Sequence, residues 1–238
     1  MTPEEMVSRL LYRDGLMLVI DKPAGLAVHA GPPNARNRRE SIEDHFDALR
    51  FGLPRPPALA HRLDRDTSGC LILGRHRKAL AQLGKLFRNG AIDKIYWAVV
   101  EGAPDGDEGT IDLPLGRLDE TRGWWMKADA RGQPAVTRWR VLGRAASRSW
   151  LALEPLTGRT HQLRVHCAEM GWPIFGDPIY GTAPRSGGPL LHLHAREIVV
   201  PLYKNRAPIG VVAPLPPHMH GALAECGWNG EADAHAAE

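Results

Sequence analysis

The sequence contains few cysteines and no long apolar run. Its 238 residues include three cysteines, Cys70, Cys167 and Cys226, which lie far apart and form no C-x-x-C pair. This pattern predicts buried thiols and argues against a disulfide framework or a cysteine-rich zinc site. No apolar run approaches the roughly 18 to 20 residues that span a bilayer. Because residues 1–11 also lack the basic and apolar regions of a signal peptide, we expect a cytoplasmic protein.

The net charge is small, +3, but the charged residues are unevenly distributed. Between Asn34 and Lys94 there are 13 Lys or Arg residues against 7 Asp or Glu residues. From Glu225 to Glu238 there are four acidic residues and no Lys or Arg. A basic amino-terminal half suits a polyanionic partner such as RNA, because phosphate neutralisation dominates such binding. Charge alone is a weak signal, since most charge runs are only solvated surfaces.

The order of apolar runs and turn residues predicts the fold class. Short apolar or alternating runs predict strands over residues 16–20, 70–73, 95–100, 136–142 and 150–153. Helical spacing and capping residues predict helices over residues 41–50, 80–89 and 161–170, the last capped by Thr160, and residues 34–39 form an arginine-rich loop. Because the elements alternate without the regular period of parallel β-α units, the expected class is α+β. We expect one domain over residues 1–220 and a partly disordered tail over residues 221–238.

The segment His61–Gly69, H-R-L-D-R-D-T-S-G, carries the strongest chemical signal. Asp64 has Arg62 and Arg65 as chain neighbours, and a T-S-G turn precedes a buried strand. Cations beside a carboxylate favour its ionised form, which acts as a nucleophile or an electrostatic stabiliser but poorly as a general acid. The alternative is a surface ion pair beside a turn, which is the commoner role of an isolated aspartate.

Two later segments add polar groups to otherwise apolar elements. In T-G-R-T-H-Q-L-R-V-H, His161 and Arg164 are three residues apart on one face of a predicted helix, and Arg159 precedes its free backbone N–H groups. The alternative is a solvated amphipathic helix. The following P-I-F-G-D-P-I-Y-G is expected to pack the helix end without touching a substrate. In K-I-Y-W-A-V-V-E-G, Tyr96 lies in a buried strand, where its ring either finds an internal partner or stacks on a base.

Together these segments resemble the RluA family of RNA pseudouridine synthases. The family's H-R-L-D-x-x-T-S-G signature is present without a mismatch. Its K-P-A-G-L-x-V-H, K-x-Y and G-R-x-H-Q-[I/L]-R-x-H elements are present in the expected order, over about residues 16–217. The resemblance implies the pseudouridine synthase fold, a mixed and largely antiparallel sheet with flanking helices and a central RNA-binding cleft. It also suggests a compact member without the amino-terminal S4 RNA-binding domain of many relatives.

The resemblance further implies a role for each matching residue. Asp64 would be the nucleophile, Arg164 would pair with its carboxylate, and Tyr96 would lie against the target base. Arg62 would fill the space of a flipped nucleotide. The residues implied to bind RNA are Arg62, Arg65, His61, Arg159 and His161. No cofactor or metal is implied, because uracil leaves C1′ through N1 and returns through C5 without oxidation or hydrolysis.

Three questions stay open at this level. The carboxylate can add either to C6 of the base or to C1′ of the ribose. Tyr96, or a water that it holds, is a candidate base for the C5 proton. The expected partner is a stem-loop of ribosomal or transfer RNA, bound by a monomer, with no DNA or membrane partner, and the sequence does not identify the uridine.

Two alternative functions are weaker. A metal-dependent hydrolase is suggested by H-x-H pairs at His192/His194 and His218/His220, but no carboxylate or cysteine completes a ligand set at convincing spacing. A catalytically silent RNA-binding protein on the same fold is the second alternative. Binding alone does not need an aspartate, a tyrosine and an arginine in this combination.

Overall fold

Two strands from distant parts of the chain lie side by side at the centre of the main sheet. The computed structural model describes residues 1–30, 40–118 and 125–230. Within it, β4 (Ser68–Gly74) runs parallel to β11 (Leu193–Val200), so that Ser68 lies opposite His194. Ser68 Oγ and His194 Nδ1 lie 2.9 Å apart and share a hydrogen bond. The T-S-G turn is therefore tied directly to β11.

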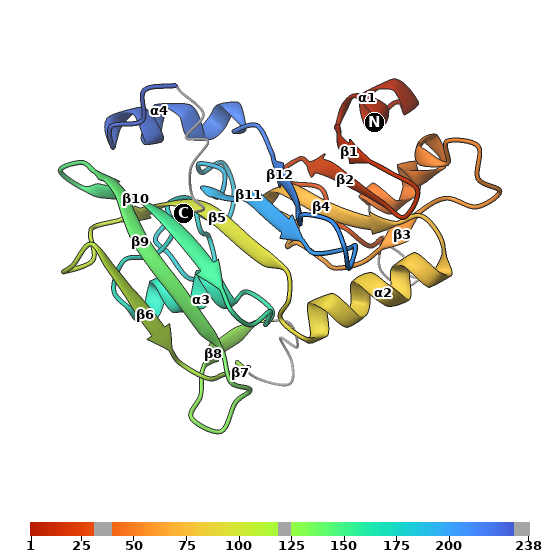
Figure 1. Cartoon of the computed structure of the whole chain (residues 1–238). Coiled ribbons are helices and arrows are strands. Elements are labelled where there is room, and N and C mark those ends of the chain that lie inside the picture. Colours follow the sequence, from red (N-terminus) through yellow and green to blue (C-terminus); the bar gives the residue numbers. More distant parts are fainter. Residues whose placement is uncertain (31–39, 119–124, 231–238) are drawn as a thin grey trace.

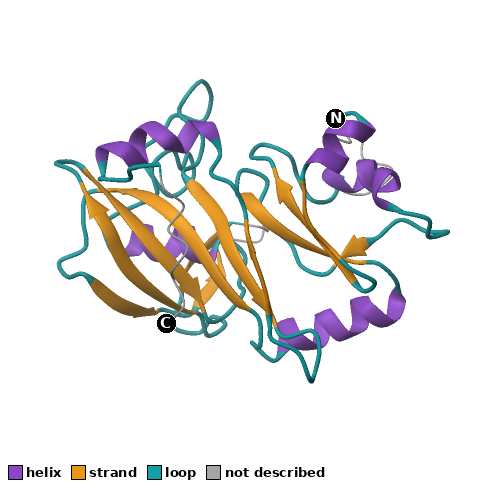
Figure 2. Cartoon of the chain, turned by 45° about the horizontal axis from the view of Figure 1, so that its top comes forward, coloured by secondary structure: helices purple, strands orange, loops and turns teal. Residues whose placement is uncertain are grey.

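Ten strands form this sheet, and Figure 2 shows it as one curved surface running through the molecule. The other eight strands are β1 (Leu10–Arg13), β2 (Met17–Lys22), β3 (Ala58–Leu59), β5 (Asp93–Glu101), β6 (Glu108–Asp112), β9 (Val136–Arg144), β10 (Arg148–Pro155) and β12 (Ile209–Val212). Their order is β1-β2-β4-β11-β5-β10-β9-β6, with β3 beside β4 and β12 beside β11. A separate ribbon is formed by β7 (Leu115–Arg117) and β8 (Met126–Ala128). Apart from β4 with β11, all strand pairings in the described parts of the chain are antiparallel.

Helices cover the sheet in separate places (Figure 1). They are α1 (Pro3–Ser8), the 3-10 helix η1 (Ile42–Leu49), α2 (Arg77–Arg88), α3 (Gln162–Glu169) and α4 (Pro217–Glu225). Apolar residues of α1, η1 and α2 share one buried cluster with β2 and β4. Leu163 and Cys167 of α3 pack on one face of β5 and β10. Because strand residues alternate between faces, α4 packs instead on Trp97 and Trp150 of the same strands. No helix of the described residues is long and apolar enough to cross a membrane.

Gly69 allows β11 to approach β4 closely. Its φ is +103°, a conformation that glycine adopts more readily than other residues. A Cβ atom built at this position would lie 2.3 Å from the carbonyl oxygen of Ala195, well inside van der Waals contact. The glycine of the T-S-G signature is thus needed for packing, immediately beside the loop that carries Asp64.

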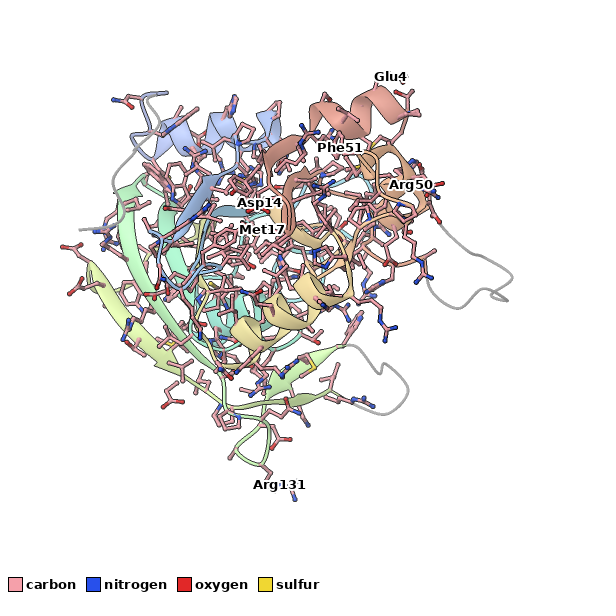
Figure 3. All side chains as sticks on the ribbon, turned by 45° about the vertical axis from the view of Figure 1, so that its right-hand side comes forward. Glu4, Asp14, Met17, Arg50, Phe51 and Arg131 are labelled. Carbon is pink, nitrogen blue, oxygen red and sulfur yellow. The ribbon has the colours of Figure 1, made fainter. Side chains whose placement is uncertain are left out.

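Asp14 stabilises the turn that precedes β2, the strand that pairs with β4. Its Oδ1 accepts hydrogen bonds from the N–H groups of Leu16 (2.7 Å) and Met17 (2.8 Å), which closes the turn before β2. Its Oδ2 accepts from the hydroxyls of Tyr12 and Tyr203. Figure 3 labels Asp14 and Met17, and it shows Arg131 at the far tip of the turn between β8 and β9.

The predicted α+β class and the largely antiparallel sheet are confirmed. All five predicted strands are present as β2, β4, β5, β9 and β10, although β2 begins one residue later than predicted. The helix predicted from residue 41 is the 3-10 helix η1, begun by a capping box between Ser41 and Asp44. The predicted loop over residues 34–39 lies outside the described residues.

The boundary expected at residue 220 falls within α4. Met219, Ala222 and Leu223 of this helix are buried on the sheet, so the packed fold continues past that residue. The disorder expected near the carboxyl terminus concerns residues 231–238 most directly, and these lie outside the described residues. The division into domain and tail stays a prediction.

Candidate active site

Lys22, at the end of β2, holds the loop that carries Asp64. Its side chain is fully buried, and Nζ donates hydrogen bonds to the carbonyl oxygens of Pro23 (2.8 Å), Arg65 (2.9 Å) and Thr67 (2.8 Å). Burial lowers the pKa of Lys22 to about 7, although the charges of Asp66 and Asp64 act against that decrease. The lysine of K-P-A-G-L-x-V-H therefore fixes the backbone on the carboxyl side of Asp64. The sequence revealed this motif but not the role of its lysine.

His61 fixes the same loop on its amino side. Its Nε2 accepts a hydrogen bond of 2.9 Å from the N–H of Ile72, and its ring packs on Phe87 with 4.6 Å between centroids. Burial lowers the pKa of His61 to about 3, so the ring is neutral at pH 7. The ring is thus occupied by internal contacts, although it borders the pocket described below. An RNA contact by His61 stays a prediction.

The carboxylate of Asp64 lies between two nitrogen atoms of the α3 region. Oδ2 is 3.7 Å from Nη1 of Arg164 and 3.8 Å from Nε2 of His161. Both distances are longer than those of strong hydrogen bonds. The positive charge of Arg164 therefore acts on Oδ2 without a short hydrogen bond to that oxygen. Of the two arginines that flank Asp64 in the sequence, Arg65 pairs with a different carboxylate. Arg65 is exposed and pairs with Asp66 at 3.3 Å.

Arg164 is clamped by Asp177. Its Nε and Nη2 donate to the two carboxylate oxygens of Asp177 at 2.7 and 2.8 Å, and both side chains are buried. Burial alone would raise the pKa of Asp177, but Arg164 and the N–H groups of Ile179 and Tyr180 hold it below its usual value. Arg164 does approach Asp64, as predicted, but its principal partner is Asp177. The segment that contains Asp177 was expected only to pack the helix end, and that expectation missed this role.

Tyr180 orients His161 through a hydrogen bond whose direction follows from a second partner of the Tyr180 hydroxyl. The hydroxyl of Tyr180 accepts from the N–H of Met126 (2.9 Å) and lies 2.8 Å from Nδ1 of His161. The Met126 N–H can only donate, so Nδ1 is the acceptor that the described residues offer to the proton of the hydroxyl. Nδ1 is then the acceptor, and the ring hydrogen is on Nε2, toward Asp64. Burial lowers the pKa of His161, which favours this neutral form.

The backbone at His161 differs from the prediction. Thr160 was expected to cap the helix, but the residue preceding α3 is His161, with φ +54° and ψ +18°. The left-handed conformation is uncommon for a residue with a Cβ atom and costs about 1 kcal/mol or more. Strain of this kind persists where the surroundings hold it, here through the contacts of His161 with Tyr180.

Two further residues of the G-R-x-H-Q-[I/L]-R-x-H motif anchor the loop before α3. Gln162 donates to the carbonyl of Val136 and to Thr137 Oγ1, and its Oε1 accepts from the N–H of Arg159. His166 Nδ1 lies 2.9 Å from Thr137 Oγ1. These side chains attach the motif to β9, which explains their presence without a contact to substrate.

Tyr96 forms part of the pocket wall beside Asp64. It lies in β5, opposite Leu153 of β10 and Ala195 of β11. Burial, reinforced by the charge of Asp64, raises the pKa of Tyr96. The phenol therefore stays protonated at neutral pH, which disfavours a phenolate as the base for the C5 proton. A ring that contacts a base, or a neutral hydroxyl that holds a water, agrees with this environment.

These groups border a pocket of about 570 Å³. The charged side chains that border this pocket are mostly cationic, because Asp64 is the only carboxylate among the described residues of its wall. The cationic side chains of the wall are Arg62, Arg88, Lys94, Arg159 and Arg164. Arg62 and Arg159 are exposed, and Nε of Arg159 donates to the carbonyl of Pro134. Arg65, which the resemblance implied as an RNA contact, is not among the wall residues. Arg88 and Lys94 are among them, although neither residue was identified from the sequence.

The histidines of the H-x-H pairs have internal partners. His192 Nδ1 lies 2.8 Å from the carbonyl of Leu190, and His194 bonds Ser68. His218 and His220 each lie 3.2 Å from a carbonyl, that of Leu191 and that of Leu215. Within the described parts of the chain, no three His, Cys, Asp or Glu residues are grouped as metal ligands would be.

Comparison with known proteins agrees with this site. A family model described as RNA pseudouridylate synthase matches residues 16–169. An uncharacterised RNA pseudouridine synthase of Zymomonas mobilis is 43% identical over 89% of this chain and 95% of that protein. Ribosomal large subunit pseudouridine synthase C of Vibrio cholerae is 34% identical over 92% of this chain and 69% of that protein. The structure of human RNA pseudouridylate synthase domain containing 4 superposes with a TM-score of 0.76 at 28% identity, covering 94% of this chain and 95% of that one.

The matched residues 16–169 include the loop of Asp64, Tyr96 of β5 and Arg164 of α3. The resemblance found in the sequence is therefore confirmed, and the relatives include ribosomal large subunit synthases of the RluA type. This chain belongs to the RNA pseudouridine synthases, which are isomerases.

Proposed function

We propose that this enzyme converts specific uridines of ribosomal or transfer RNA stem-loops to pseudouridine, with Asp64 as the nucleophile. The observation that carries the proposal is the position of Asp64, a lone carboxylate between Arg164 and His161 in an otherwise cationic pocket. An ionised carboxylate with an accessible oxygen is a competent nucleophile. The surrounding positive charge suits a polyanionic substrate.

Both chemical routes use the same carboxylate oxygen. Attack on C1′ displaces uracil through N1, whereas attack on C6 adds the base to the enzyme. In each route the N1–C1′ bond breaks, the uracil turns, and a bond forms between C5 and C1′. The proton on C5 is then lost, and the carboxylate is released unchanged. The neutral phenol of Tyr96 serves as a wall for the base in this scheme, and a water accepts the C5 proton.

The target nucleotide must leave its helix or loop to reach Asp64, which costs a few kcal/mol. We propose that Arg62 offsets part of this cost by filling the vacated space. Arg62 is exposed and lies two residues before Asp64 at the pocket wall, which supports this role. Arg159, His61 and Arg65 are further candidate contacts to RNA. Cytoplasmic location and a monomeric state stay predictions.

Release of tritium from RNA labelled at uridine C5 tests the proposal. Wild-type protein should release tritium from ribosomal or transfer RNA in the presence of a chelator. Asp64→Asn should release none while still binding RNA. Equal release by both proteins would show that Asp64 is not the nucleophile. Binding without release by the wild type on either RNA would favour the silent RNA-binding protein.

A further inference from the structure

Helix α2 presents four cations to solvent and contains no acidic residue. Its sequence is R-K-A-L-A-Q-L-G-K-L-F-R, and the exposed cations are Arg77, Lys78, Lys85 and Arg88, the basic face of α2. At 3.6 residues per turn, spacings of seven and eleven residues bring these side chains to one side of the helix. The opposite side buries Ala79 and Leu83. The cations therefore form a row along α2 rather than a scattered set.

A stabilising effect on the helix explains the presence of only two of these four cations. Lys85 and Arg88 lie in the last turn, where positive charge interacts favourably with the helix dipole. Arg77 and Lys78 lie in the first turn, where the same dipole disfavours them, and no acidic residue lies there to offset it. None of the four makes an ion pair within the described parts of the chain. Two unfavourably placed cations point to a partner outside the protein.

The row is continuous with the pocket of Asp64. Phe87 and Arg88, at the carboxyl-terminal end of α2, border that pocket, as do Arg62 and Lys94. In Figure 1, α2 extends from this end along the lower side of the molecule, away from β5. A helix of 12 residues is about 18 Å long, which is enough to lie along several phosphates of one strand of a duplex.

We propose that the basic face of α2 docks the phosphate backbone of the paired RNA stem that adjoins the target uridine. This inference rests on the proposed function, because it assigns the flanking part of the same RNA to a surface that adjoins the pocket. Charge complementarity and continuity with the pocket select RNA over other polyanions. Contacts of this kind position the nucleic acid without reading its sequence.

A charge-matched pair of double variants tests the proposal. Lys78→Gln/Lys85→Gln removes two cations of the basic face. Arg138→Gln/Arg140→Gln removes two exposed cations of β9, which is four strands from β4 in the sheet. Fluorescence anisotropy would measure binding to a labelled hairpin with a long stem and to single-stranded oligouridine. Each protein would be titrated at several salt concentrations.

The α2 double variant should bind the hairpin about tenfold more weakly and lower the salt slope of log K by about two, as expected for two lost phosphate contacts. Its affinity for oligouridine should change much less, and the β9 variant should match the wild type. Thermal unfolding of Lys78→Gln should occur at the wild-type temperature or higher, because a first-turn cation is removed.

Unchanged hairpin affinity and salt slope in the α2 variant would overturn the proposal. Equal weakening on hairpin and oligouridine would overturn the assignment to a paired stem. These binding measurements do not require turnover. If the wild-type protein released no tritium but bound hairpins through α2, the proposed reaction would be excluded and the proposed docking surface would still be supported.

Discussion

Asp177 holds two nitrogen atoms of Arg164 at 2.7 and 2.8 Å and leaves the third, Nη1, 3.7 Å from the candidate nucleophile. The short pair is buried, so it fixes the guanidinium plane. The longer contact lets the charge act on the Asp64 carboxylate without a strong hydrogen bond that reaction would have to break. Asp177 thus acts through Arg164 as a positioning residue.

Asp177→Asn should lower kcat by about 10- to 100-fold, because a small displacement of Arg164 changes the field at Asp64. The free energy of unfolding should fall by about 3 kcal/mol, since the buried guanidinium loses its charged partner. Tritium-release kinetics and urea denaturation measure the two effects. Asp47→Asn is the control, because Asp47 pairs with Arg50 on an exposed surface, where loss changes stability by about 0.5 kcal/mol or less. A wild-type kcat in Asp177→Asn would contradict the positioning role.

Tyr180→Phe should release the ring of His161 from its single tautomer. The hydroxyl that connects Met126 N–H to Nδ1 is lost, while the aromatic ring that packs on the guanidinium of Arg164 is retained. We expect kcat to fall about tenfold, the effect of one lost hydrogen bond of about 1.4 kcal/mol. Nitrogen-15 spectra of the imidazole would report the tautomer directly. The assignment is wrong if the wild-type ring carries its hydrogen on Nδ1, and Tyr203→Phe, at the Asp14 turn, provides the control.

Lys22→Met should destabilise the loop of Asp64 more than the loss of a surface lysine would suggest. The variant keeps the buried volume but leaves three carbonyl oxygens without their donor, at about 1 to 3 kcal/mol for each unsatisfied group. We expect the free energy of unfolding to fall by at least about 3 kcal/mol in urea denaturation. The exposed Lys204→Met should differ from wild type by no more than about 0.5 kcal/mol. Similar values for the two variants would rule out an anchoring role.

Stability should fall when the pH is lowered from 6.5 toward 4. Burial lowers the pKa of His61 to about 3 and those of His192 and His194 to about 4. In this range the unfolded chain binds more protons at each histidine than the folded chain does, so each contributes a loss of at most about 1.4 kcal/mol per pH unit, and less near either end of the range. Asp21 opposes this loss, because burial raises its pKa to about 6.

Urea denaturation at pH 7, 6 and 5 would measure this dependence. His192→Gln should reduce the slope between pH 6 and 5 by about 1 kcal/mol per pH unit. An unchanged slope in that variant would mean that His192 titrates normally in the folded protein. Above about pH 7.5, one unit beyond the unfolded-state pKa of about 6.5, the variant and the wild type should change in parallel.

The sequence predicted those features that depend on local pattern or on a distinctive motif. The alternation of apolar residues located the strands, and the T-S-G turn marked the passage from the loop of Asp64 into β4. The proximity of Arg164 to Asp64 was implied by the resemblance to a known family, and the structure places the two side chains 3.7 Å apart. These inferences needed only neighbours within a few residues or a known motif.

Contacts that span the fold were not predictable in the same way. Asp177 lies in a turn-rich segment whose composition indicated packing alone, and no local pattern shows that its carboxylate reaches back to Arg164. Lys22 and Arg65 are 43 residues apart, and their hydrogen bond depends on how β2 pairs with β4. The left-handed backbone at His161 likewise follows from its tertiary partner Tyr180, and Thr160 looked like the better cap by propensity.

The parallel pairing of β4 with β11 imposes an order on the folding of the enzyme during its synthesis. On the ribosome, β4 emerges more than one hundred residues before β11, its neighbour on the side of Ser68 and Gly69. At about 5 to 20 residues per second, that edge of β4 waits several seconds or longer for its partner. Such non-local pairing is slow and leaves a strand edge open to other chains. A nascent chain released before β11 would carry the Asp64 signature without a finished active site.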